Sequence, residues 1–311
     1  MEKRKLIILT GPTAVGKSKL SIKLAKTIGG EIISADSMQV YKYMNIGTDK
    51  ISPEKQENVP HHLIDFLDPK EDFNVFVFQK LVKEAIEGIY KRGHVPIIVG
   101  GTGFYIQAVI YDIDFTETDE DDVYRKELEE RARTEGVHVL HQELKEVDPE
   151  SAEAIHENNV KRVIRALEYY KKTGKPISEH NKEQKERSSP YDFKYFVLTD
   201  KRENLYSRID KRVDQMIEDG LEDEVKELLK LGSPKTATSM QGLGYREMFG
   251  YLEGEYDLSR AIYLIKRNTR HFAKRQLTWF KRERDVIWID KNDFDHNDDL
   301  ILKEIVRIYE Q

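Results

Sequence analysis

The chain of 311 residues contains no cysteine. This absence excludes disulfide bonds and cysteine-type zinc sites, and it makes a reducing cytoplasm the expected compartment. No apolar run approaches the length of a membrane span, and the basic first residues lead directly into an apolar segment rather than a signal peptide. The composition therefore predicts a soluble globular protein without membrane association.

An excess of positive charge is also missing, because the chain carries a formal net charge of −6. This negative net charge argues weakly against a nucleic-acid partner, but the charged residues are unevenly distributed along the chain. Residues 260–284 hold nine Lys and Arg and a single acid, Glu283. A basic element is therefore expected within an acidic chain.

A phosphate-binding loop lies near the N-terminus. Residues 11–18 fit the pattern G-x-x-x-x-G-K-[ST], with an apolar strand before them and a helical run after them. Backbone N–H groups and a helix N-terminus form an anion cradle in that setting, Lys17 adds a charge, and Ser18 can hold Mg²⁺. The expected phosphate-binding residues are Gly11, Pro12, Thr13, Ala14, Val15, Gly16, Lys17 and Ser18.

Apolar strand-like runs alternate with helical stretches, which predicts an α/β fold with a parallel sheet flanked by helices. The strands are expected at 6–9, 31–34, 95–99, 195–198 and 286–289, and helices at 17–28, 76–91, 205–231, 258–282 and 299–309. Residues 116–190 are charged, helix-prone and free of β-rich runs, so we expect an all-helical insertion with a mobile polar tail at 181–190. Residues 1–115 and 191–311 would then form a core like that of P-loop nucleotide-binding proteins.

Asp36 follows the second expected strand. Ligands of open parallel sheets bind outside the carboxyl ends of the strands, so this carboxylate is expected near the phosphate loop. There it would hold Mg²⁺ or accept a proton. The competing interpretation is a helix N-cap, a position that Asp favours.

The third expected strand ends in Gly100-Gly101-Thr102-Gly103 and lacks an acid. Nucleotide-hydrolysing P-loop enzymes usually carry an acid at such a strand end, where it organises Mg²⁺ and water. The absence weakens an ATPase or kinase interpretation. The glycines permit close backbone approach, and Thr102 could bond Asp36 or a substrate, although a simple tight turn is an equal alternative.

The helix expected at 258–282 is basic on one side. Arg260, Arg267, Lys274 and Lys281 recur every seven residues, with Arg270 beside them, whereas Ile265, Phe272 and Trp279 lie nearly opposite. We expect the apolar side to pack on the core. The cationic stripe suits a polyanion backbone, and an ordinary solvated face is the alternative.

Three further groups of residues leave alternatives open. Arg208 and Arg212 share a helix face and suit phosphate contacts, but an ion-pair ladder with Asp210 and Asp214 competes equally. A second basic cluster, Lys161, Arg162 and Arg165, lies on the insertion and would meet a different part of a large ligand. Adjacent His61 and His62 point apart in most backbones, which favours a structural role over a metal site.

Together these motifs resemble the bacterial tRNA dimethylallyltransferases, or tRNA isopentenyltransferases. Seven stretches carry the resemblance in family order and span nearly the whole chain. They are residues 11–18, Ser-Ala-Asp-Ser-Met-Gln-Val-Tyr at 34–41, Pro-His-His-Leu-Ile-Asp at 60–65, Val-Gly-Gly-Thr-Gly-Phe-Tyr at 99–105, and the stretches at 161–168, 241–247 and 267–280.

The resemblance implies transfer of a dimethylallyl group from dimethylallyl diphosphate to N6 of adenosine 37, beside the anticodon, in tRNAs reading codons that begin with U. It implies a P-loop-like fold whose helical insertion grips the anticodon stem-loop, with Mg²⁺ as the ion. The donor diphosphate would lie on the phosphate loop, with Arg208 as a further contact. Asp36 would be the general base, assisted by Lys17 and Thr102. The tRNA-binding residues implied by the resemblance are Asp36, Ser37, Met38, Gln39, Thr102 and Arg125. The further residues expected to bind tRNA are Lys161, Arg162, Arg165, Gln241, Arg267, Arg270 and Lys274.

Three alternatives use the same motifs. A small-molecule kinase would bind ATP at the loop, but it requires the acid that is missing after Val99. An adenylate isopentenyltransferase would use a free nucleotide as acceptor, and the insertion and basic helix favour tRNA instead. A non-catalytic RNA-binding module would not need Asp36 with a complete phosphate loop. The expected partners are tRNA and dimethylallyl diphosphate, and the expected oligomeric state is a monomer.

Overall fold

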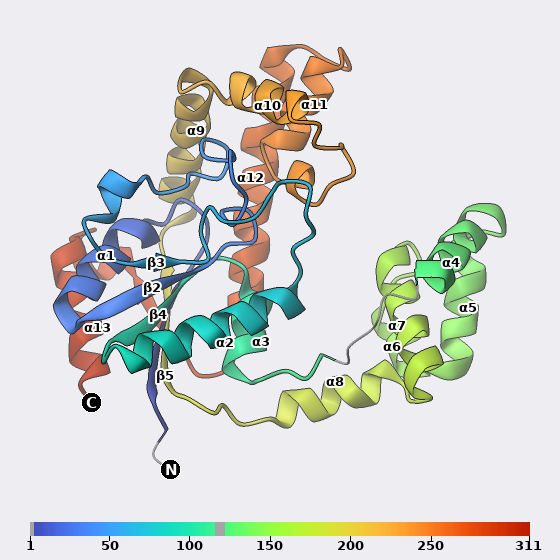
Figure 1. The fold of residues 1–311 in the computed structure, drawn as a ribbon, viewed down its shortest axis with the longest axis horizontal. Helices are drawn as coiled ribbons and strands as arrows, with labels where there is room; N and C mark the ends of the chain where they lie inside the picture. Colours follow the sequence, from blue (N-terminus) through green and yellow to red (C-terminus); the bar gives the residue numbers. More distant parts are fainter. Residues whose placement is uncertain (1–2, 116–121) are drawn as a thin grey trace. The chain divides into compact units, whose positions relative to one another are not determined.

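The computed structural model describes residues 3–115 and 122–311. The chain divides into two compact units, one formed by Met1–Ile110 with Pro190–Gln311 and the other by Tyr111–Ser189 (Figure 1). The start predicted for the insertion, residue 116, falls in the segment 116–121, outside the described residues. The two units are described separately.

The first unit is built on six parallel strands in the order β3-β2-β4-β1-β5-β6. This sheet confirms the predicted fold class. The sequence did not predict β3, which has only two residues. The strands are β1 (Lys5–Thr10), β2 (Gly30–Ala35), β3 (His61–His62), β4 (Val95–Gly100), β5 (Asp192–Thr199) and β6 (Val286–Asp290).

Helices cover both faces of the sheet. In Figure 1, α1 and α13 lie on one side and α2 and α3 on the other. Ile7, Leu9 and Ile97 point to the first side, where they form a buried cluster with residues of α1 and α13. The sheet-covering helices are α1 (Lys17–Ile28), α2 (Val75–Lys91), α3 (Gly103–Ile110) and α13 (Asp298–Tyr309).

The helix predicted at 205–231 is two helices. It is interrupted at Gly220, whose left-handed backbone (φ 97°) ends one helix and precedes the next. An isolated glycine in a helical pattern is often tolerated, so the pattern alone did not reveal the break. The remaining helices of this unit are α9 (Arg202–Glu218), α10 (Leu221–Lys230), α11 (Tyr245–Leu252) and α12 (Leu258–Phe280).

The second unit is helical and has its own apolar cluster, which includes Leu128, Leu140 and Leu167. The prediction of a mobile tail at 181–190 is wrong for its first part, because a helix continues to Glu186. There the Gln184 side chain accepts a hydrogen bond from the Asp114 backbone at 2.9 Å. The helices are α4 (Asp122–Thr134), α5 (Val137–Val147), α6 (Pro149–Ala154), α7 (Val160–Thr173) and α8 (Ile177–Glu186).

His62 has a structural partner at the start of β2. Its Nε2 lies 2.7 Å from Oε2 of buried Glu31, which Arg92 also contacts through two hydrogen bonds and His94 through one. The bonds from Arg92 are the main reason that the pKa of Glu31 falls to about 2, and those from the two histidines add to them. His61 turns to the Val59 carbonyl at 2.8 Å. Among the described residues, no helix is long and apolar enough to cross a membrane.

Candidate active site

The phosphate loop joins β1 to α1, as its sequence predicts. The Lys17 side chain folds back over the loop and donates hydrogen bonds to the carbonyls of Gly11 (2.9 Å) and Pro12 (2.8 Å). Burial lowers the pKa of Lys17 to about 8. The positive charge of Arg212 contributes to the lowering, which the negative charge of Asp36 opposes. The lysine is thus half-buried beside the loop, and its proton is held less tightly than that of an exposed lysine.

Arg208 supports the loop from outside the cavity. Its Nε donates to the Ala14 carbonyl at 2.9 Å, and its Nη2 pairs with Asp200, whose side chain is fully buried after β5. Lys291 approaches the same loop, with its Nζ 3.5 Å from the Val15 carbonyl. These residues fix the loop, and Arg208 does not line the cavity described below. Its predicted contact with the diphosphate stays a prediction.

Arg212, one turn further along α9, faces the cavity. Its Nη1 donates to Thr13 Oγ1 at 3.0 Å and lies 3.4 Å from an Asp49 carboxylate oxygen. Its buried Nε has no hydrogen-bond partner among the described residues. Arg212 thus lines the cavity with its guanidinium, whereas its Nε is closed to solvent.

The predicted ion-pair ladder along α9 is wrong. Asp210 pairs with Arg270 and Asp214 with Lys266, so both acids reach across to α12 rather than along their own helix. Because the acids are engaged there, Arg208 and Arg212 are available to the phosphate loop.

Asp36 follows β2 directly. Its Oδ1 accepts hydrogen bonds from the backbone N–H groups of Met38 (2.9 Å) and Gln39 (3.3 Å). Its Oδ2 accepts none from the part of the chain that the structure describes. The helix N-cap alternative is wrong, because residues 37–40 form a turn and no helix begins there. The turn engages only one carboxylate oxygen, and Asp36 still lines the cavity.

A buried glutamine links the phosphate loop to the glycines after β4. The Gln276 side chain accepts from the Thr13 N–H at 2.9 Å and donates to the Gly101 carbonyl at 3.0 Å. A Cβ on Gly101 would lie 2.2 Å from the Gln276 Nε2, so any larger residue there would displace the glutamine amide. Sequence reasoning missed Gln276. The available signal was a neutral polar residue within a strongly basic helix.

Thr102 follows these glycines and lines the cavity. Its backbone N–H donates to the Ala35 carbonyl at 3.3 Å, which holds the turn beside Asp36. Among the described residues, no hydrogen bond joins the Thr102 and Asp36 side chains. The sequence allows a hydrogen bond from Thr102 either to Asp36 or to a substrate, and the bond to a substrate stays a prediction.

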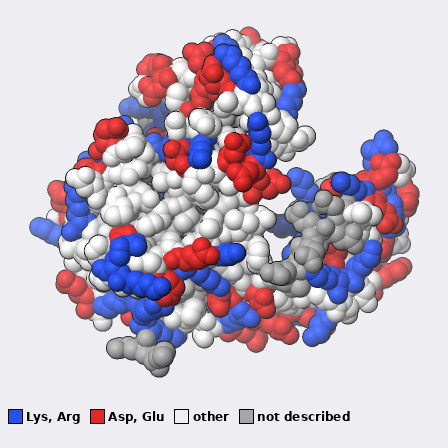
Figure 2. Space-filling view, viewed as in Figure 1, with Lys and Arg blue, Asp and Glu red and all other residues white. Residues whose placement is uncertain are grey.

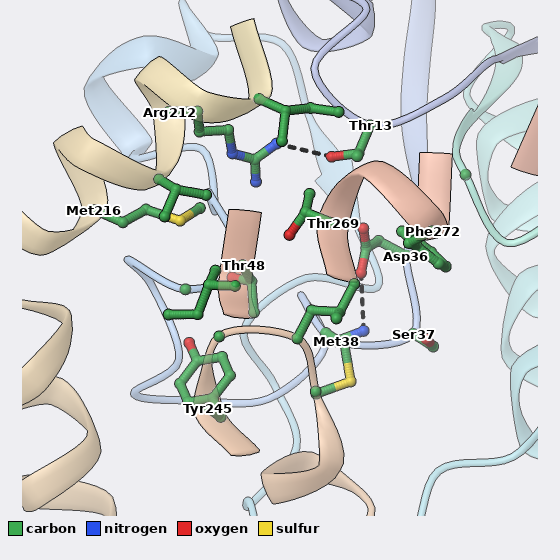
Figure 3. Close-up of a pocket in the computed structure, with 18 of the residues that line it drawn as sticks. Thr13, Asp36, Ser37, Met38, Thr48, Arg212, Met216, Tyr245, Thr269 and Phe272 are labelled. Atoms are coloured by element: carbon green, nitrogen blue, oxygen red, sulfur yellow. Dashed lines mark hydrogen bonds between the residues drawn. The ribbon is translucent and has the colours of Figure 1, made fainter. Parts of the chain in front are cut away.

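These elements enclose a cavity of about 310 Å³ in the first unit, a size at the lower end for small-molecule sites. Figure 3 shows Thr13 and Arg212 on one side, Met38 and Tyr245 opposite them, and Asp36 beside Phe272. Sequence reasoning missed Thr48, Leu243, Tyr245, Thr269 and Arg275, which also line it. Its apolar wall consists of Met38, Ile209, Val213, Met216, Leu243, Ile265 and Phe272.

The basic helix α12 follows its prediction only in part, with Ile265 of its apolar side buried as expected. On the side predicted to pack on the core, Phe272 lines the cavity instead. On the cationic side, Arg270 is paired with Asp210, whereas Lys274 is exposed. Figure 2 shows Lys and Arg interspersed with Asp and Glu over the visible face. An open groove beside α12 is lined by His271, Lys274, Arg275, Thr278, Trp279 and Arg282.

The other predicted tRNA-binding residues lie in different settings. Arg125 pairs with buried Glu168 inside the helical unit at 2.9 Å, and Lys161 and Arg162 of that unit are exposed. Gln241 lines the cavity, and its side chain donates to the Lys235 carbonyl at 2.6 Å. Arg267 lies on α12, where its Nε contacts the Asn268 side chain at 3.1 Å.

Comparison with known proteins identifies the family. The sequence model of the IPP transferase family matches residues 39–283, and that of the isopentenyl transferase family matches residues 4–65. A protein named tRNA dimethylallyltransferase from Lachnoclostridium phytofermentans is 62% identical over 303 residues, which cover 97% of this chain and 96% of that protein. The chain belongs to the IPP transferase family.

Further relatives agree with this membership of the IPP transferase family. A tRNA dimethylallyltransferase from Carboxydothermus hydrogenoformans is 56% identical over 92% of each chain. The structure of a tRNA isopentenylpyrophosphate transferase from Bacillus halodurans is 47% identical with a TM-score of 0.74, covering 99% of this chain and 97% of that one. A eukaryotic dimethylallyltransferase described as acting on tRNA is 35% identical with a TM-score of 0.81, covering 92% of this chain and 74% of that one. The predicted family and enzyme class, a prenyltransferase of the IPP transferase family, are confirmed.

Proposed function

We propose that this enzyme transfers a dimethylallyl group from dimethylallyl diphosphate to N6 of adenosine 37 in tRNAs reading codons that begin with U, giving N6-(dimethylallyl)adenosine. It would act as a monomer in the cytoplasm. Relatives named tRNA dimethylallyltransferase support the reaction type. The observation that carries the proposal is one cavity with a phosphate loop on one side, a carboxylate on another and an apolar wall.

The donor diphosphate would occupy the cradle at the N-terminus of α1. Backbone N–H groups and Lys17 meet its negative charge there, and the guanidinium of Arg212, which lines the cavity, adds a further positive charge. The leaving group is the diphosphate itself, so these cations stabilise charge where it develops. The branched five-carbon chain would lie against the apolar wall.

Magnesium fits this donor set. Ser18 is exposed at the start of α1, and Mg²⁺ typically combines one or two protein oxygens with substrate phosphates and water rather than an all-protein cage. Ser18 would hold the ion against the diphosphate. When bound, the ion would neutralise charge on the leaving group.

Asp36 would act as general base. The adenine amine is a poor nucleophile because its lone pair is delocalised into the ring. As N6 attacks C1 of the dimethylallyl group, the C–O bond to the diphosphate breaks, and a proton on N6 passes to the carboxylate. The free Oδ2 of Asp36 suits that transfer, because Oδ1 is already engaged by two backbone N–H groups.

The adenine must leave the anticodon loop to reach Asp36, so we expect base flipping. Ser37, Met38, Gln39 and Thr102 would surround the flipped base. The remaining contacts to the stem-loop would come from cations on α12 and on the helical unit, which meet the phosphates of the RNA. These are Arg125, Lys161, Arg162, Arg165, Arg267, Arg270 and Lys274, together with Gln241.

The test is mass spectrometry of unmodified tRNA after incubation with dimethylallyl diphosphate and Mg²⁺. We expect a mass gain of one dimethylallyl group on adenosine 37. Parallel reactions replace the donor by ATP, or tRNA by free AMP, because a kinase or an adenylate isopentenyltransferase would respond to one of these changes. Modification of AMP without modification of tRNA would overturn the proposal.

A further inference from the structure

One carboxylate away from the proposed chemistry ties two distant segments together. Glu224 on α10 accepts hydrogen bonds from three consecutive backbone N–H groups, those of Asn45 (2.7 Å), Ile46 (2.8 Å) and Gly47 (3.1 Å). Its Oε1 also accepts from the Tyr245 hydroxyl at 2.7 Å. A single side chain thus holds a loop from the N-terminal part of the chain against the start of α11.

The two segments joined by Glu224 form part of the cavity wall. Gly47, Thr48 and Tyr245 all line the cavity, and we call these three residues the cavity floor. A Cβ on Gly47 would lie 2.6 Å from the Tyr245 ring, so the two pack in direct contact. Burial raises the pKa of Tyr245 far above its ordinary value, and its hydroxyl therefore stays protonated and donates to Glu224.

The same loop is fixed from a second direction. The Gln39 side chain, next to the strand end that carries Asp36, donates to the carbonyls of Thr48 (3.1 Å) and Asp49 (3.3 Å). The loop therefore has hydrogen bonds to α10 on one side and to the segment after β2 on the other. A movement of the cavity floor would break several of these hydrogen bonds, most of which are partly buried.

We propose that Glu224 is a positioning residue that fixes the cavity floor and thereby limits the donor to a five-carbon prenyl chain. This inference rests on the proposed function, which places the chain between the phosphate loop and the floor. Figure 3 shows Tyr245 and Thr48 on the other side of the cavity from Thr13. A prenyl chain whose diphosphate is bound at the loop would extend from Thr13 toward them. A ten-carbon chain would extend further toward the floor than a five-carbon chain, so a fixed floor would select against it.

The test compares dimethylallyl diphosphate with geranyl diphosphate as donors to tRNA. Glu224→Gln keeps one acceptor oxygen but turns an amide NH₂ toward backbone N–H groups, which loosens the floor. We expect the ratio of kcat/KM for the five-carbon donor to that for the ten-carbon donor to fall about tenfold or more. Glu227→Gln is the matched control, because Glu227 lies on the same helix, is exposed and pairs with Lys230.

A second variant covers the case in which Glu224→Gln does not fold. Tyr245→Phe keeps the ring and removes only the hydroxyl, and it should lower the same ratio by a smaller factor. An unchanged ratio in the folded variants, even with a lower Tm, would overturn the proposal, since a purely structural role alters stability alone.

Met216→Ala separates this inference from the proposed function on which it rests. Met216 belongs to the apolar wall rather than to the floor. If Met216→Ala raises the donor KM while the Glu224 and Tyr245 variants leave the ratio of kcat/KM between the two donors unchanged, only the role proposed for Glu224 is overturned. If Met216→Ala leaves the donor KM unchanged, the prenyl chain does not occupy this cavity, and both proposals fail.

Discussion

The two faces of α12 differ in what their polar groups contact. On the cavity face, Thr269, Phe272 and Gln276 are neutral, and both ends of the Gln276 amide bond the backbone of the substrate-side loops. On the outer face, His271 and Lys274 line an open groove, and Arg275 lies between the two faces and lines both the groove and the cavity. One helix therefore organises a small-molecule cavity and presents cations to solvent.

Under the proposed function, donor chemistry and RNA affinity would be separable by position on this single helix. A residue on the cavity face acts through fixed hydrogen bonds at short distance. A residue on the outer face acts through charge, which salt screens. Substitutions near the cavity should therefore change turnover, whereas substitutions in the groove should change tRNA affinity and its salt dependence.

The largest effect is expected at Asp36, which lies beside Phe272 of the cavity face (Figure 3). Asp36→Asn keeps an acceptor oxygen for the Met38 and Gln39 N–H groups and removes the base. We expect single-turnover transfer to fall about 100-fold or more, with unchanged tRNA affinity. Asp65→Asn is the control, because that carboxylate is largely exposed and pairs with Lys50. Near-normal transfer by Asp36→Asn would remove Asp36 as the base.

The next largest effect is expected at Gln276 itself. Gln276→Leu leaves the Thr13 N–H and the Gly101 carbonyl without their buried partner, which should lower the free energy of unfolding by about 1–3 kcal/mol. The displaced loops should lower kcat/KM for the donor by about 10- to 100-fold. Thr278→Val on the outer face should change neither quantity. Steady-state assays and thermal melts measure both quantities. If Gln276→Leu and Thr278→Val had equal effects, the two faces of α12 would not differ in function.

Gln276 also shows where sequence reasoning stops. The phosphate loop, Asp36 and Thr102 were predicted because each lies in a short local pattern at a strand end. Gln276 bonds Thr13 across 263 residues, and no local pattern encodes that contact. The same holds for the contacts of Glu224 with the 45–47 loop, since both depend on how α10 and α12 pack.

The fold was predictable to a similar extent. Apolar runs identified five of the six strands, and four of these five are largely buried, whereas β6 was identified from its apolar residues alone. The strand His61–His62 was missed because it is short and polar, and it depends on the buried carboxylate of Glu31. The split between α9 and α10 was missed because helical periodicity resumes after Gly220.

A moderate effect is expected from pH, through Lys17. The pKa of Lys17 is about 8 in the free protein, and a bound diphosphate would hold the lysine protonated. Binding above pH 8 must therefore take up a proton, so donor affinity should fall by about tenfold between pH 7 and pH 9. Isothermal titration of the donor would measure this. The Lys17→Met variant should bind the donor weakly, and its donor affinity should no longer depend on pH. If the affinity of this variant still falls with rising pH, another group causes the dependence.

The smallest effect is expected on the outer face, at Lys274. Lys274→Glu should weaken tRNA binding about fivefold to tenfold at low salt and reduce the slope of log K against log salt by about 1, because a phosphate contact is lost. The donor KM should not change. Arg270→Glu is the informative comparison, because it also leaves Asp210 unpaired and should lower the Tm. A tRNA affinity that Lys274→Glu does not alter would make the groove an ordinary solvated face, and α12 would then act through its cavity face alone.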